Sequence, residues 1–202
     1  MTQSTANPNR IPIGKVLRAS TQQFVFGTKV PKSDVPIFGS LVKTTIQYQN
    51  ATIYGLIFNI EIQDDGMTKM LSVADDVSQE EIEWQRSRRV PVEASVLCVG
   101  YQPDGQPMRY NLPAQPPIIL DPIYACDETE MCDFVAKSDY FRLVIDSRDA
   151  PSDELLAASI RLCADAQGGG ARDAYLLRCG RELARLIGND GARLENLLRR
   201  MA

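Results

Sequence analysis

Four closely spaced carboxylates come nearest to a catalytic pattern in this sequence: Asp127, Glu128, Glu130 and Asp133. Residues three apart share a helix face, so Asp127 with Glu130, or Glu130 with Asp133, would form a pair. Paired carboxylates are able to hold Mg²⁺ for phosphodiester cleavage. The alternative is a solvated acidic helix start, which the helix dipole favours. No basic or aromatic cluster accompanies them, so we prefer the alternative and expect no catalytic residue, metal site or cofactor.

The 202-residue sequence contains no histidine. This excludes Ser-His-Asp and Cys-His catalysis and the HExxH zinc site. Its five cysteines form an odd set without a CxxC pair. Such a set predicts reduced thiols and a cytoplasmic protein.

The charge balance also limits the function. With 22 basic and 26 acidic residues the net charge is -4, so we expect no whole-chain basic field and no direct sequence-specific contact with nucleic acid. No uncharged apolar run approaches ~18 residues, and the N-terminus lacks the pattern of a secretory signal. We therefore expect no membrane span.

The pattern along the chain predicts a mainly β protein with helices. Residues 1–10 are polar and are predicted to be a disordered lead-in. Four short strands with tight turns follow up to residue 62, and further strands are expected between 90 and 125. Together they predict a small, closed or nearly closed β-barrel over residues 11–125. Gly55, inside the most apolar strand, indicates a bulge, a barrel corner or a close backbone approach.

Two further regions contain helices. The Ser78–Glu81 capping box predicts a helix over about 78–89, inserted between strands of the barrel. Residues 126–202 are predicted to be mixed and then helical. We expect a short helix near 127–137, a strand at 140–145, and three helices from about Ser152 onward, with Gly168–Gly170 ending the first of them.

Short segments in the N-terminal part resemble the HAS-barrel, the small barrel of HerA-type DNA translocases and of the rotary ATP synthase head. The segments that carry this resemblance are Ile13–Val16, Gly39–Lys43, Ile53–Ile57 and Pro116–Ala125. The resemblance covers roughly residues 11–125. It implies a barrel that forms a collar on a ring and docks a partner, which in the HerA case is a NurA-like nuclease.

One departure from that family decides our functional expectation. HerA-like proteins carry a RecA-like motor, but no GxxxxGK[ST] phosphate-binding loop occurs in this sequence. The resemblance therefore implies a non-catalytic adaptor that docks to a HerA-like ATPase or its NurA-like nuclease in DNA processing. The alternatives are a self-assembling structural ring, which would be a homo-oligomer, and a weak metal-dependent nuclease accessory.

Two groups of residues are candidates for the partner interface. Trp84 stands beside basic residues, a composition common at interfaces, although it would also suit a lid packed onto the barrel. The other group lies on the last helix, where a leucine stripe either covers a core or pairs with another helix. The interface candidates are Trp84, Arg88, Arg89, Arg193, Leu194, Leu197 and Leu198.

Overall fold

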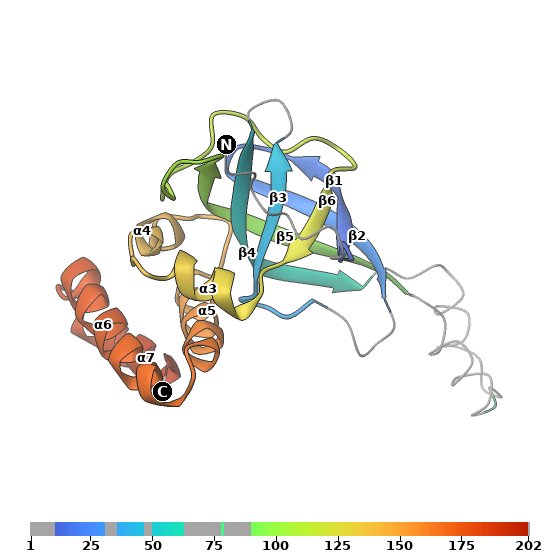
Figure 1. Ribbon diagram of the computed structural model, residues 1–202. Coiled ribbons are helices and arrows are strands. Elements are labelled where there is room, and N and C mark those ends of the chain that lie inside the picture. Colours follow the sequence, from blue (N-terminus) through green and yellow to red (C-terminus); the bar gives the residue numbers. More distant parts are fainter. Residues whose placement is uncertain (1–10, 31–35, 47–49, 63–77, 79–89, 202) are drawn as a thin grey trace.

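Six strands close into an antiparallel barrel, with helices gathered on one side of it (Figure 1). The computed structural model describes residues 11–30, 36–46, 50–62, 78 and 90–201. The strands are β1 (Gly14–Ala19), β2 (Gln23–Val30), β3 (Leu41–Ile46), β4 (Ala51–Ile62), β5 (Val90–Pro103) and β6 (Pro122–Ala125). The helices are α3 (Glu128–Phe134), α4 (Tyr140–Ile145), α5 (Ser152–Ala166), α6 (Gly169–Ile187) and α7 (Gly191–Met201).

The barrel closes because the short strand β6 pairs with both β1 and β3, giving the order β1-β2-β5-β4-β3-β6. The predicted small β-barrel followed by C-terminal helices is thus confirmed. Since every strand has two partners, the ring has no free edge. A partner protein cannot join it by adding a strand and must contact side chains or loops instead.

Strands β4 and β5 are buried on both faces, which explains why their sequences are nearly continuously apolar. Along β5, Val96 and Cys98 belong to the barrel interior, whereas Leu97 and Val99 pack with the helices. Gly55 in β4 lies at a register shift, and a Cβ added there would meet Val96 at 2.3 Å. Both the predicted bulge and the predicted close approach occur there.

Helix α5 lies directly against the loop before β3. A Cβ on Gly39 would be 2.7 Å from the Cβ of Ala158, and Gly39 has φ +85, so this contact depends on glycine. Helices α6 and α7 pack on the outer side of α5 and bury Leu183 and Met201 in the same core. One apolar core therefore joins the helices to the outer wall of the barrel.

One local prediction in the helical region is wrong. Residues 140–145 form helix α4 rather than a strand, because Tyr140, Phe141 and Val144 bury one helical face against the core. The prediction that the glycine run ends the first of the three helices is confirmed, since α5 ends at Ala166. Gly168, with φ +73, ends the turn after α5, and Gly169 already begins α6.

Candidate functional site

The candidate interface helix at 78–89 cannot be placed. Its residues Trp84, Arg88 and Arg89 lie outside the described residues, as does the predicted lead-in at 1–10. Of this helix only Ser78 is described. The prediction that Trp84 contacts a partner therefore remains a prediction.

The candidates on the last helix mostly face the chain itself. Leu197 is buried in the helical core, and Leu194 packs against that core. Arg193 forms a two-pronged ion pair with Asp153 at the start of α5, with Nη2 2.7 Å from Oδ1. This carboxylate raises the pKa of the Arg193 guanidinium. Leu198 is partly exposed but leans over Gly180 of α6.

The carboxylate cluster is accounted for by helix capping. Asp127 accepts from the Glu130 backbone N–H at 2.9 Å, and Glu130 accepts from the Asp127 N–H at 3.1 Å, which is a capping box. Glu130 also pairs with Lys43 on β3, so it ties α3 to the barrel. In the described part of the chain, no group of three or more His, Cys, Asp or Glu residues is arranged to hold a metal ion.

Exposed aliphatic side chains gather instead on the wall around β1 and β6. Ile118, Ile119 and Leu120 are 40, 62 and 65% exposed, and Leu17 on the neighbouring β1 is 41% exposed. We call these four residues the aliphatic rim. Its three consecutive members just before β6 form an apolar surface of the kind that marks interaction sites.

The loop of the aliphatic rim is held by backbone hydrogen bonds. The Leu120 N–H donates to the Val16 carbonyl at 2.8 Å, and the Val16 N–H donates to the Asp121 carbonyl at 3.0 Å. The Asp121 side chain, which is largely buried, accepts from the Ile118 N–H at 2.9 Å. These contacts fix the loop against β1 and aim its side chains outward.

This arrangement forces strain on one residue. Leu120 has φ +72, a left-handed conformation that costs a non-glycine residue ~1–2 kcal/mol. Asn or Gly would adopt it with less strain. A leucine therefore occupies a position where the backbone favours another residue, and its side chain is mostly in solvent rather than in the core. Such strain is a pointer to function.

Sequence reasoning missed the aliphatic rim because its pattern predicts a broken strand over residues 118–120 and 123–125, interrupted at Asp121 and Pro122. The apolar character of residues 118–120 suits a strand, but the structure places them in a turn before β6. The signal was present in the flanking prolines. Pro116, Pro117 and Pro122 lack the N–H that a continuous strand ladder requires.

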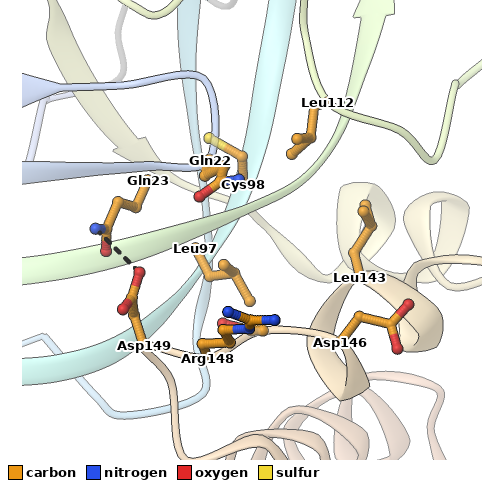
Figure 2. A pocket seen from close by; sticks show the side chains of 10 residues that line it. Gln22, Gln23, Leu97, Cys98, Leu112, Leu143, Asp146, Arg148 and Asp149 are labelled. Carbon is orange, nitrogen blue, oxygen red and sulfur yellow. Dashed lines mark hydrogen bonds between the residues drawn. The ribbon is translucent and has the colours of Figure 1, made fainter.

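A second feature is a cleft of about 470 Å³ between the barrel and the connection from α4 to α5 (Figure 2). It is lined by Gln22, Gln23, Leu97, Cys98, Leu112, Leu143, Asp146, Ser147, Arg148 and Asp149. The Gln23 amide donates to Asp149 at 3.5 Å, a weak contact. Burial raises the pKa of the Cys98 thiol to about 12, so this thiol stays protonated at neutral pH. The cleft therefore mixes charges of both signs around a thiol that is a poor nucleophile.

The comparisons with known proteins give no family. A scan against protein-family models finds no match, and a search of curated proteins finds no significant match. Among the described residues, no helix is both long enough and apolar enough to cross a membrane.

Proposed function

We propose that the protein is a non-catalytic docking module that binds a protein partner through the aliphatic rim. The observation that carries this proposal is the run Ile118–Leu120, exposed to solvent and held rigidly at a cost in backbone strain. The strained apolar loop contributes little to the stability of the fold, because its side chains bury little surface. Burial of this apolar surface against a partner removes it from water, which favours binding.

The closed ring supports docking by side chains. The six-stranded barrel offers a rigid base, and the backbone hydrogen bonds from β1 keep the loop in one conformation. A preorganised loop loses little conformational entropy on binding, so a small apolar surface is able to give useful affinity.

For the partner we propose a HerA-like DNA-translocating ATPase or its NurA-like nuclease. The support is the resemblance of residues 11–125 to the HAS-barrel, together with a closed antiparallel six-stranded barrel that is compatible with it. In this proposal the chain supplies a docking barrel in DNA processing and leaves ATP hydrolysis to its partner.

Affinity capture from the native cell extract, followed by mass spectrometry, tests the proposal. We expect wild-type protein to recover one partner in near-equal amount, and Leu120→Asn to lose it. Asn tolerates the left-handed backbone, so this variant removes the apolar side chain without adding strain. Leu177→Asn is the matched control, because Leu177 is an aliphatic residue of α6 that is 57% exposed, and α6 lies away from β1 and β6 (Figure 1).

Equal recovery with Leu120→Asn would show that docking does not use the aliphatic rim. Recovery of the tagged chain's own untagged copies instead would move the proposal to self-assembly, which light scattering of the pure protein would then measure.

A further inference from the structure

The charges beside the aliphatic rim differ from those of the whole chain. The protein carries a net charge of -4, yet in segments 11–20 and 112–122 the exposed charged residues are Lys15 and Arg18. The only carboxylate in these two segments is Asp121, which is largely buried and accepts from a backbone N–H. These two segments therefore expose basic side chains and no acidic one, although Arg18 is paired with Glu93 of β5.

The local backbone turns both cations outward beside Leu17. Val16 points into the barrel, and a register shift between Val16 and Arg18 leaves Leu17 as an extra residue on the outer face. Lys15, two positions before Leu17, lies on the same outer face. Within the described residues, Lys15 has no carboxylate within ion-pair distance, whereas Arg18 reaches Glu93 at 3.3 Å.

We infer that the aliphatic rim inserts into an apolar pocket of a partner protein, and that a carboxylate at the edge of this pocket pairs with Lys15. This inference rests on the proposed docking function and adds the chemistry of the partner. The exposed aliphatic side chains of the loop favour an apolar site on the partner. The Lys15 ammonium, which has no carboxylate partner among the described residues, favours an acidic group. Pairing across the interface selects the orientation and the partner more than it adds affinity.

A protein pocket fits these observations better than a lipid surface does. Recognition of anionic lipid uses clusters of about four to eight Lys or Arg residues, whereas segments 11–20 and 112–122 expose two cations, Lys15 and Arg18, and Arg18 is paired with Glu93. The loop is also fixed by hydrogen bonds at Val16 and Asp121. A fixed shape matches a defined pocket, whereas a fluid bilayer gains nothing from it.

Zero-length carbodiimide coupling tests the inference directly, because it joins an amine only to a carboxylate in contact with it. The tagged protein is treated in native extract, captured, and digested for mass spectrometry. We expect Lys15 to be joined to an Asp or Glu of another protein, and this product to disappear with Leu120→Asn. Lys137, exposed between α3 and α4, is the internal control and should give no such product.

Charge reversal supplies a second readout. Lys15→Glu should lower the captured amount about tenfold, because it places two negative charges opposite each other in the interface, while Lys15→Arg should retain it. Lys137→Glu should leave capture unchanged. Capture that is equal in Lys15→Glu, with no coupling at Lys15, would overturn the inference and leave the docking function standing. If wild-type protein captures no partner at all, both the inference and the docking function would be overturned.

The lipid alternative is tested by flotation with vesicles of phosphatidylcholine and phosphatidylserine. Absence of the protein from the floating fraction agrees with the inference. Flotation of wild type that is lost in both Leu120→Asn and Lys15→Glu would overturn it in favour of a membrane surface.

Discussion

The backbone conformation of Leu120 predicts an unusual order of stability between its alanine and glycine variants. At most positions, replacing alanine by glycine destabilises a protein by ~0.5–1 kcal/mol, because glycine loses more backbone freedom on folding. Leu120 has φ +72, where an L-residue costs ~1–2 kcal/mol that glycine does not incur. We therefore expect Leu120→Gly to be more stable than Leu120→Ala by about 0.5–1 kcal/mol.

Ile119 is the matched control position. Its side chain is exposed to almost the same extent, and its φ is not in the left-handed region. There the usual order should hold, with Ile119→Ala more stable than Ile119→Gly by about 0.5–1 kcal/mol. Comparing alanine with glycine at one position cancels the loss of the original side chain, so the difference reports the backbone alone.

Urea unfolding of the four variants measures these differences, provided that each unfolds in a single transition with the same slope. A greater stability of alanine at both positions would refute the reasoning. It would mean that Leu120 is not held in the left-handed conformation in solution, and the strain argument for the aliphatic rim would fail with it.

Three further predictions concern the barrel, the helix cap and the buried thiols. Gly55→Ala should destabilise the protein by ~1–3 kcal/mol through a clash inside the wall, whereas Gly170→Ala, in open space on α6, should stabilise it by up to ~1 kcal/mol; urea unfolding that ranks them in reverse would contradict this packing. Asp127→Ala should cost ~1 kcal/mol in the same assay by removing a cap, and no loss would mean that the capping box is absent in solution. Burial raises the pKa of Cys98 and Cys163 from 9.0 to about 12, so above pH 9 the folded state keeps protons that the unfolded chain releases. The free energy of unfolding should therefore fall as pH rises above 9, and less steeply in Cys98→Ala. The same slope of unfolding free energy against pH in Cys98→Ala and wild type would contradict this.

The barrel could be predicted from the sequence because its strands are apolar or alternating runs bounded by turn residues. Strand β4 shows this best, since the glycine inside it marks the place where the backbone comes closest to β5. The helix start at Asp127 is equally local, because a capping box depends on residues only three apart.

Other features depend on tertiary contacts that a single sequence does not show. The six residues of α4 are too short and too apolar for periodicity to separate helix from strand. They are helical because three of their side chains fit the core shared with α5. Arg193 illustrates the same limit, since its partner Asp153 stands forty residues away.

The aliphatic rim was missed because the direction of an apolar side chain depends on how its backbone pairs with neighbouring strands, which composition does not show. The sequence predicts residues 118–120 to be the first half of a broken strand, but prolines on both sides prevent a continuous ladder and the loop turns outward against β1. The candidate residues on α7 show the converse, because the stripe that suggested an interface largely covers the chain's own core.

The most direct test of docking through the aliphatic rim is the affinity of the captured partner, measured by calorimetry with purified proteins. We predict that Leu120→Asn weakens binding about tenfold or more, the loss of one hot-spot side chain, while Leu177→Asn binds like wild type. An affinity of Leu120→Asn equal to that of wild type would contradict the account.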